Sequence, residues 1–364
     1  MPRLQEYPKI LYEKIPKSGK LLSKIGFGTF RSFNPFALKE AIENGINLID
    51  TSSHFGNGAR EAAIGSIVSQ YPNLRSHLTL STKAGYIYNG KTNFKECFQI
   101  KDSFYSIHPD YLQYSITESL KRLQVDYLDI FMLNNPERLL QVQGGLIGKQ
   151  RLMEMIDTSS SYLQQEVKDG RIKRFGICSN SIGIQSAPDH FDVTKFVGMD
   201  GFEVVQYPLN LFEQNAINSQ FGDSLAEKMI DQGIYQITNR PFNAITPNGV
   251  LKLVKRPLND HEINEKVTLQ FEKVVQLEQE LESKLEGDIT DSILLSKFCI
   301  AQIIGDNLSR LVTNEMACKL YFDRDLKPEL EKDFEYLKDS DLETEFVESF
   351  IKKYKKVTVF NLGN

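Results

Sequence analysis

Short apolar runs alternate with amphipathic segments between about residue 22 and residue 240 of the chain. This alternation is typical of parallel strands whose connecting helices pack on the outside of the sheet. The run YLDIFML is apolar almost throughout, as expected for a strand that is buried on both faces. The pattern predicts an α/β fold with a parallel barrel, and seven strands at 22–30, 46–50, 78–82, 127–133, 172–178, 202–206 and 233–238.

Turn-forming residues delimit two of the connecting helices. Asn34 can cap a helix that begins at Pro35, and Gly45 can adopt the left-handed conformation that ends it. A second helix is expected to begin at Pro109. Its apolar residues recur at helical spacing and should face the sheet: Leu112, Ile116, Leu120 and Leu123.

The C-terminal third is harder to assign to elements of a barrel. A charged amphipathic helix is predicted at 260–285, and we place the eighth strand at 308–313. Residues 320–364 are expected to form a helical C-terminal extension. Because no repeat or low-complexity linker divides the sequence, we expect a single domain over 1–364.

Composition and charge exclude several classes of function. The 364 residues are 41% hydrophobic and 25% charged, with a formal net charge of -5, so a nucleic-acid partner is not expected. No apolar run reaches the roughly 20 residues that a membrane span needs. The four cysteines lack disulfide or metal-ligand spacing, so we expect no metal and a cytoplasmic, reducing location.

Polar residues follow the predicted strands where apolar packing alone does not require them. They are Asp50, Lys83, Asn134, Asn180 and Gln206, each at or just past the carboxyl end of a strand. That end of a parallel barrel is where enzymes of this architecture place their chemistry. The sequence therefore predicts one site at this rim, although Asp50 could instead cap the helix that follows it.

Five ordered motifs resemble the aldo/keto reductase family: DTSSHFGNGAREAAIG (50–65), LSTKAGY (80–86), YLDIFMLNNPE (127–137), GRIKRFGICSN (170–180) and QYPLNLFE (206–213). The segments NNPE and NRPFNAI are similar to a branch of that family with HNPE and NRPL motifs. The resemblance is strongest over 20–245. It implies a (β/α)8 TIM barrel with extra C-terminal helices.

In that family, hydride passes between a nicotinamide and a carbonyl carbon while a tyrosine hydroxyl gives or takes the proton. By resemblance, Asp50 and Lys83 are the aspartate and lysine that tune the tyrosine. Asn134 stands at the position of the histidine that orients the substrate oxygen, and Phe55 stands at the position of the tyrosine. An amide can still donate a hydrogen bond, but phenylalanine has no proton to give.

Three groups could replace the missing proton donor. His54 is the candidate surrogate next to Phe55, although neighbouring residues at a strand end usually point in opposite directions. Tyr86 and Tyr88 follow Lys83 in the next loop, and a bound water is the third alternative.

The resemblance also implies a cofactor site for NADP or NAD. Ser179, Asn180 and Gln206 match the side chains that hold the nicotinamide carboxamide, with Cys178 as an alternative to Ser179. Asn239 and Arg240 lie in the motif that contributes phosphate contacts. The region after the predicted eighth strand lacks a glycine turn, so the sequence does not choose between NADP and NAD.

These features predict an NAD(P)-dependent oxidoreductase that acts on a small carbonyl or alcohol substrate with atypical or reduced activity. Two alternatives remain open. The chain could be a catalytically inactive binding or regulatory protein that keeps the barrel, since both Phe55 and Asn134 depart from the family pattern. It could also catalyse a non-redox elimination or isomerisation, with Lys83 as the base.

Overall fold

The computed structural model describes residues 12–252, apart from short gaps, together with Thr358–Val359. The gaps fall at 24–25, 31–32, 34, 44, 88–91, 143–146, 210–212, 214, 218–221, 241–242 and 247–248. The predicted helix at 260–285 and the predicted strand at 308–313 lie outside the described residues. So does the extension at 320–364, except for Thr358–Val359, which is a strand.

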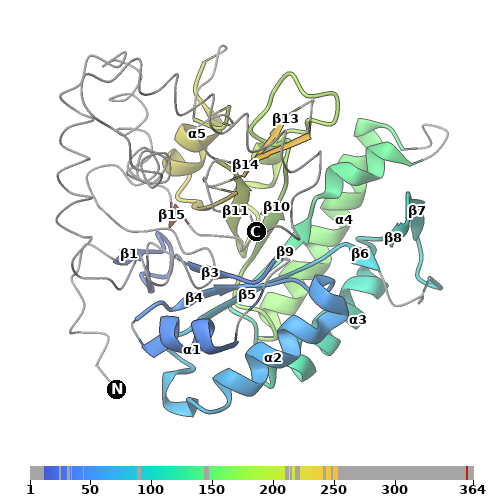
Figure 1. Cartoon of the computed structure of the whole chain (residues 1–364). Coiled ribbons are helices and arrows are strands. Elements are labelled where there is room, and N and C mark those ends of the chain that lie inside the picture. Colours follow the sequence, from blue (N-terminus) through green and yellow to red (C-terminus); the bar gives the residue numbers. More distant parts are fainter. Residues whose placement is uncertain are drawn as a thin grey trace, which may run out of the picture.

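The centre of the molecule is a curved, eight-stranded parallel sheet (Figure 1). Its order is β15-β12-β11-β10-β9-β5-β4-β3, and every neighbouring pair is parallel. The strands are β3 (Gly26–Gly28), β4 (Leu48–Asp50), β5 (Thr79–Ala84), β9 (Ile130–Asn134), β10 (Phe175–Cys178), β11 (Phe202–Pro208), β12 (Tyr235–Asn239) and β15 (Thr358–Val359). Each of the seven predicted strands overlaps one of them, and β15 supplies the eighth.

Helices α1 (Pro35–Glu43), α2 (Ala59–Val68), α3 (Pro109–Leu123) and α4 (Lys149–Lys168) cover the outer face of the sheet (Figure 1). The short helix α5 (Leu225–Asp231) precedes β12. Gly45 has a φ of 96°, so it ends the first βα unit in the left-handed conformation expected of it. Leu112, Ile116 and Leu123 of α3 are buried, which confirms the predicted apolar face.

Alternation along the strands separates two apolar cores. Ile130 and Met132 of β9 pack inside the curve of the sheet, whereas Phe131 and Leu133 pack against the helices. Leu48 of β4 belongs to the inner core in the same way. Because side chains alternate between the two faces of a strand, both faces of this sheet are buried, as expected of a parallel barrel.

Smaller antiparallel elements surround the sheet. They are β1 (Tyr12–Lys14) with β2 (Leu21–Ser23), β6 (Tyr86–Ile87) with β7 (Phe98–Ile100) and β8 (Ser103–Tyr105), and β13 (Asn243–Thr246) with β14 (Gly249–Lys252). Ile15 and Leu22, in and beside the β1–β2 hairpin, pack into the inner core. The hairpin therefore covers one end of the curved sheet.

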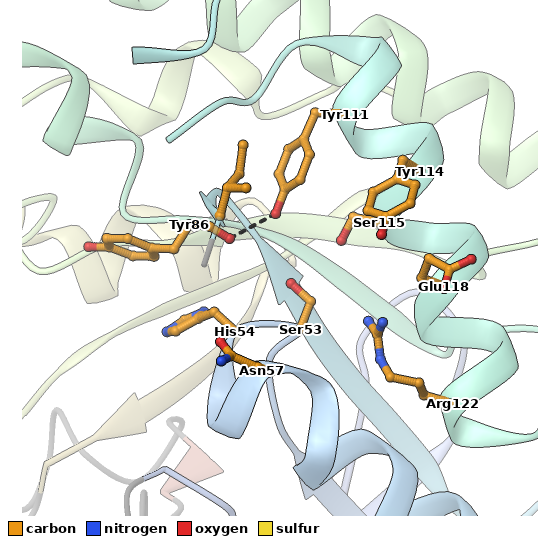
Figure 2. Close-up of a pocket in the computed structure, with 10 residues that line it drawn as sticks. Ser53, His54, Asn57, Tyr86, Tyr111, Tyr114, Ser115, Glu118 and Arg122 are labelled. Atoms are coloured by element: carbon orange, nitrogen blue, oxygen red, sulfur yellow. Dashed lines mark hydrogen bonds between the residues drawn. The ribbon is translucent and has the colours of Figure 1, made fainter. Parts of the chain in front are cut away.

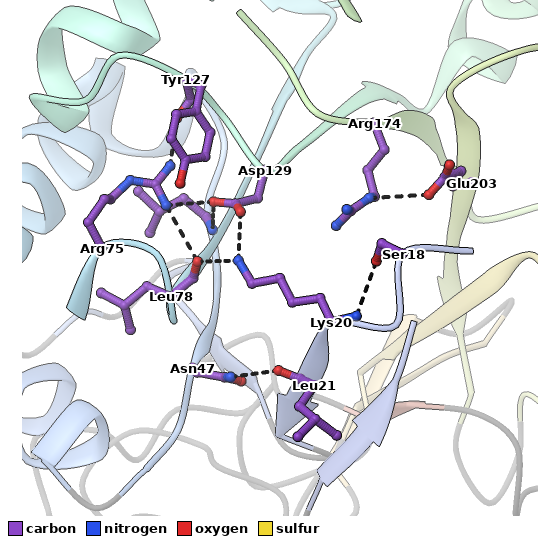
Figure 3. Close-up of polar contacts among 11 residues, drawn as sticks. Ser18, Lys20, Leu21, Asn47, Arg75, Leu78, Tyr127, Asp129, Arg174 and Glu203 are labelled. Carbon is purple, nitrogen blue, oxygen red and sulfur yellow. Dashed lines mark hydrogen bonds and ion pairs between the residues drawn. The ribbon is translucent and has the colours of Figure 1, made fainter. Parts of the chain in front are cut away.

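An ion-pair cluster fastens this hairpin to the amino ends of the strands (Figure 3). Asp129, just before β9, accepts hydrogen bonds from Lys20 Nζ and Arg75 Nη1, both at 2.8 Å. Burial lowers the pKa of Lys20, while the nearby Asp129 opposes the shift. The amino end of such a barrel contributes stability, so we assign these charges to the fold.

No helix in the described part of the chain is long and apolar enough to cross a membrane.

Candidate functional site

The polar side chains predicted at the strand ends share one face of the sheet. Asp50, Asn134 and Gln206 each lie two residues after a member of the inner core, namely Leu48, Met132 and Val204. Lys83 alternates with Leu80 and Ala84, which face the helices. Strand periodicity therefore directs these polar groups into the carboxyl mouth of the curved sheet.

Asp50 and Lys83 form a buried ion pair at this mouth. The Lys83 ammonium contacts Asp50 Oδ2 and donates to the Thr51 carbonyl at 3.0 Å, while the Ser81 hydroxyl donates to Asp50 Oδ1 at 2.7 Å. Burial raises the pKa of Asp50, and the positive charge of Lys83 opposes that shift. The two side chains meet because β4 and β5 are adjacent and parallel.

Phe55 lies beside this pair. Its ring centroid is 6.0 Å from Lys83 Nζ and 5.0 Å from the ring centroid of Phe30. Phe55 opens the 3-10 helix η3 (Phe55–Gly58), in which Gly56, Asn57 and Gly58 all have left-handed backbones. Glycine is favoured at position 58 because its φ is 87°, a left-handed conformation that side chains rarely adopt. The Phe55 ring therefore lies next to the buried Asp50–Lys83 pair.

His54 reaches the same region because the loop turns after β4. Its ring centroid is 4.6 Å from that of Phe55 and 4.9 Å from that of Tyr86, and its Nδ1 is 2.7 Å from the Ser52 hydroxyl. Burial and the Lys83 charge lower the pKa of His54 to about 3. The imidazole is therefore neutral near pH 7, and an imidazolium acid is not available from this residue.

Asn134 is buried and lies level with Cys178 of the neighbouring strand. The backbone carbonyl of Asn134 accepts a hydrogen bond of 2.7 Å from the Tyr105 hydroxyl, which fixes the end of β9. The Asn134 side chain itself has no titratable group. Asn134 remains a candidate hydrogen-bond donor to a substrate oxygen.

Sequence reasoning did not single out Glu137. It lies in the 3-10 helix η5 (Pro136–Gln141) after β9 and is buried. One carboxyl oxygen accepts from the backbone N–H of Asn180 at 3.0 Å, and burial raises the pKa of Glu137 to about 7. In the sequence, Glu137 is marked only as the last residue of the NNPE motif. The fold shows that its carboxylate supports the loop after β10.

Two buried amides lie side by side at the ends of β11 and β12. Asn239 Nδ2 is 3.5 Å from Gln206 Oε1, which also accepts from the Cys178 thiol at 2.9 Å. The Gln206 side chain also hydrogen-bonds to the Asp50 carboxylate, whereas Asn239 Oδ1 is buried and has no hydrogen-bond partner in the described structure. An unsatisfied acceptor fits the NH₂ group of a carboxamide, so Asn239 suits a nicotinamide ring.

The thiol of Cys178, rather than the hydroxyl of Ser179, contacts Gln206. Ser179 Oγ instead accepts from the Ser181 amide at 3.2 Å. Burial raises the pKa of Cys178 to about 12, so this thiol is protonated and acts here as a hydrogen-bond donor. Cys178 and Ser179, the two alternatives for one contact to the nicotinamide carboxamide, therefore differ in their hydrogen-bond partners.

Arg240 is joined to Asn180 rather than to Gln206. Its Nη2 donates to Asn180 Oδ1 at 2.9 Å, and its Nη1 lies 3.5 Å from the Glu213 carboxylate. Asn180 and Glu213 also line a pocket of ≈ 240 Å³ beside β11. Arg240 thus holds Asn180, in the loop after β10, by a hydrogen bond, and its positive charge is paired with the Glu213 carboxylate.

The chain belongs to the aldo/keto reductase family, because the model of the Aldo/keto reductase family matches residues 24–275, more than half of its length. The match includes every strand of the parallel sheet except β15, and the Asp50–Lys83 pair. In the part of the chain described here, no group of His, Cys, Asp and Glu could hold a metal ion.

Individual relatives are distant. "Aldo-keto reductase YhdN" of Bacillus subtilis (strain 168) is 24% identical over 215 residues, 56% of this chain and 55% of its own length. "NADH-specific methylglyoxal reductase" of Escherichia coli (strain K12) is 27% identical over 124 residues, 30% of this chain and 37% of its own. The chain thus spans about half, or less, of the curated relatives that it matches.

Solved structures support the fold. The holo form of aldo-keto reductase AKR11C1 from Bacillus halodurans superposes with a TM-score of 0.53 at 16% identity, covering 95% of this chain and 97% of that one. Glycerol dehydrogenase AKR11B4 from Gluconobacter oxydans superposes with a TM-score of 0.50 at 18% identity, covering 81% of this chain and 83% of that one. At such identities the similarity establishes the TIM-barrel type of fold alone.

Proposed function

We propose that this chain is an NAD(P)-dependent oxidoreductase of small carbonyl or alcohol substrates with an atypical supply of the proton. The observation that supports this most directly is the buried Asp50–Lys83 pair at the carboxyl mouth of the sheet. Keeping two charges away from water is costly, so their retention points to a working site. The free thiols of Cys97 and Cys178 suit a reducing, cytoplasmic location.

A bound nicotinamide would supply the hydride chemistry. In the proposed site, the Lys83 ammonium and the Asn134 amide hold the carbonyl oxygen and stabilise the negative charge that develops on it. Asp50 supplies the counter-charge for Lys83, and Phe55 contributes an apolar wall. Each well-placed donor of this kind contributes about 3 kcal/mol to lowering the barrier.

The proton requires another source than residue 55. A neutral His54 is a poor acid, since its pKa is lowered to about 3. We therefore assign the proton to a water molecule beside the Lys83 ammonium. A positioned general acid contributes roughly 10²- to 10⁴-fold in rate, so turnover of ordinary aldehydes is expected to be slow.

The cofactor site in this proposal combines Gln206 and Asn239 at the nicotinamide with Ser179, Asn180 and Arg240 around it. The unsatisfied Oδ1 of Asn239, next to the Gln206 side chain, supports the first part. NADP and NAD are both retained as cofactors to be tested, because Arg240 is already paired with Glu213. By analogy with the methylglyoxal reductase relative, small aldehydes such as methylglyoxal are the first substrates to try.

Titration of the full chain with NADPH and NADH tests this proposal. We expect saturable binding of at least one of them, and Gln206→Ala should weaken it by about 1–3 kcal/mol through the loss of a buried hydrogen bond. Gln165→Ala removes the same amide from the outer surface of α4 and should leave the affinity unchanged. Binding that is equally strong in Gln206→Ala would place the nicotinamide elsewhere.

A second candidate is a non-catalytic binding protein. The Phe30–Phe55 ring pair beside Lys83 favours it, because an apolar cover can exclude water without supporting proton transfer. Nicotinamide binding without turnover of any carbonyl would support this candidate. Turnover without a nicotinamide would support the non-redox alternative, with Lys83 as the base.

A further inference from the structure

The buried carboxyl of Glu137 lies against the loop that follows β10. Asn135 precedes it with a left-handed φ of 52°, and the backbone N–H of Asn135 donates to the Cys178 carbonyl at 2.6 Å. This contact continues the pairing of β9 with β10 beyond the level of Asn134 and Cys178. The turn into η5 therefore carries the Glu137 side chain to the loop that begins at Ser179.

The carboxylate contacts two consecutive residues of this loop. Its Oε1 accepts from the backbone N–H of Asn180 at 3.0 Å, and the Ser179 hydroxyl donates to the same carboxylate. The Ser179 hydroxyl accepts in turn from the backbone N–H of Ser181 at 3.2 Å. Since Ser179 and Asn180 belong to the nicotinamide site of the proposed function, Glu137 fixes that part of the site through a connected set of hydrogen bonds.

The Asn180 side chain has a separate support. Its Oδ1 accepts from Arg240 Nη2 at 2.9 Å, and Arg240 pairs with Glu213. Loss of the Glu137 contact would release the backbone N–H of Asn180 but leave its side chain anchored. We therefore expect such a loss to weaken cofactor binding rather than to abolish it.

The cation next to Glu137 in the chain has other partners. Arg138 Nη1 donates to Gln141 Oε1 at 3.0 Å, and the Arg138 guanidinium also donates to the Tyr86 hydroxyl. Figure 2 shows the Tyr86 ring directed away from Arg122, so its hydroxyl is turned toward η5 rather than toward α3. Burial raises the pKa of Glu137 to about 7, against the opposing effects of the loop donors and the Arg138 charge. The carboxyl can therefore gain and lose its proton near neutral pH.

Three further charged or titratable side chains face Glu137 from neighbouring elements: Tyr105 of β8, Cys178 of β10 and Arg240 after β12. Burial raises the pKa of Tyr105 well above its ordinary value and that of Cys178 to about 12. An arginine keeps its charge throughout the range in which proteins are folded. Because none of these groups gains or loses charge near pH 7, a change at that pH is assigned to Glu137.

We propose that Glu137 is a positioning residue of the nicotinamide site, whose carboxylate holds the loop after β10 in its cofactor-binding conformation and whose protonation weakens that hold. The inference rests on the function proposed above. Protonation turns one carboxyl oxygen into a donor, so the Ser179 hydroxyl loses its acceptor. Cofactor affinity is therefore expected to be highest above pH 7 and to fall as the pH falls through it.

The test is the affinity of the full chain for NADH and NADPH at pH 6 and at pH 8, measured by the fluorescence of the reduced nicotinamide. With a pKa of about 7, roughly one chain in ten carries the ionised Glu137 at pH 6, so we expect about ten-fold weaker binding than at pH 8. Glu137→Gln keeps the shape of the side chain but cannot ionise. It should bind equally at both pH values, with the lower affinity that the unmodified chain shows at pH 6.

A second measurement follows the carboxyl without any cofactor. The chain is labelled with ¹³C at the side-chain carboxyl of glutamate, and the NMR signal of Glu137 is identified by its absence in Glu137→Gln. The chemical shift of this signal is expected to titrate with a midpoint near pH 7. A midpoint at the ordinary value of an exposed glutamate would overturn the proposal.

His190→Gln is the matched control, because His190 is a titratable group on the same loop. Its Nδ1 lies 3.1 Å from the Ser181 carbonyl. This variant should keep the ten-fold difference between the two pH values. If Glu137→Gln does not fold, Ser179→Ala serves instead: it removes a donor to the carboxylate, so the midpoint of the affinity profile should move to higher pH.

The outcomes separate this inference from the proposed function. Equal affinity of the unmodified chain at both pH values, a pH dependence that persists in Glu137→Gln, or one that disappears in His190→Gln would overturn the inference, while cofactor binding itself would still support the proposed function. No binding of NADH or NADPH at either pH would contradict both.

Discussion

Lys83→Met is expected to lower the free energy of unfolding by about 3–5 kcal/mol, because it leaves the Asp50 carboxylate buried without its counter-charge. Asp50 is fully buried, and the Lys83 ammonium is the cation that contacts it in the described structure. The variant should regain stability as the pH falls, since a protonated Asp50 no longer carries a buried charge. Urea unfolding at several pH values measures both effects.

The matched control for this result is the double variant Asp50→Asn with Lys83→Met. Replacing both members of a buried ion pair is often close to neutral, so the double variant should be more stable than Lys83→Met alone. If Lys83→Met unfolds at the same urea concentration as the unmodified chain, the buried pair does not exist in solution.

Phe55→Tyr is expected to raise the rate of aldehyde reduction by at least ~10-fold, because it restores a general acid beside Lys83. The ring already lies near Lys83 Nζ, and a neighbouring positive charge lowers the pKa of a phenol. Adding Asn134→His should raise the rate further and non-additively, since both groups would act on one substrate oxygen. Steady-state kinetics with NADPH and NADH over a panel of small aldehydes gives the comparison.

Phe30→Tyr is the control, because it adds the same hydroxyl to the ring that contacts Phe55. It should not increase the rate. If the unmodified chain turns over a substrate and Phe55→Tyr abolishes that activity, Phe55 serves a different reaction and the non-redox alternative gains support.

Much of the fold followed from the sequence because two periodicities are strong in it. Apolar runs at strand length located seven strands, and Pro35, Gly45 and Pro109 marked helix ends. Because side chains alternate between the two faces of a strand, Asp50 and Gln206 lie on the inner face, two residues beyond Leu48 and Val204. Adjacency of β4 and β5 then brings Asp50 to Lys83.

What the sequence did not predict depends on contacts between distant segments. The eighth strand, β15, is only two residues long and carries no periodicity that a sequence pattern could detect. The role of Glu137 requires the approach of the Asn180 amide, 43 residues away in the chain.

The measurement that tests the central claim most directly is the transfer of deuterium from a reduced nicotinamide with two deuterium atoms at C4 to a small aldehyde. The unmodified chain is incubated with the labelled NADPH or NADH, and the alcohol product is analysed by mass spectrometry. Our account expects slow formation of an alcohol with one deuterium on its carbinol carbon, and faster formation with Phe55→Tyr. No labelled alcohol from either protein, with either cofactor and any aldehyde of the panel, would contradict it.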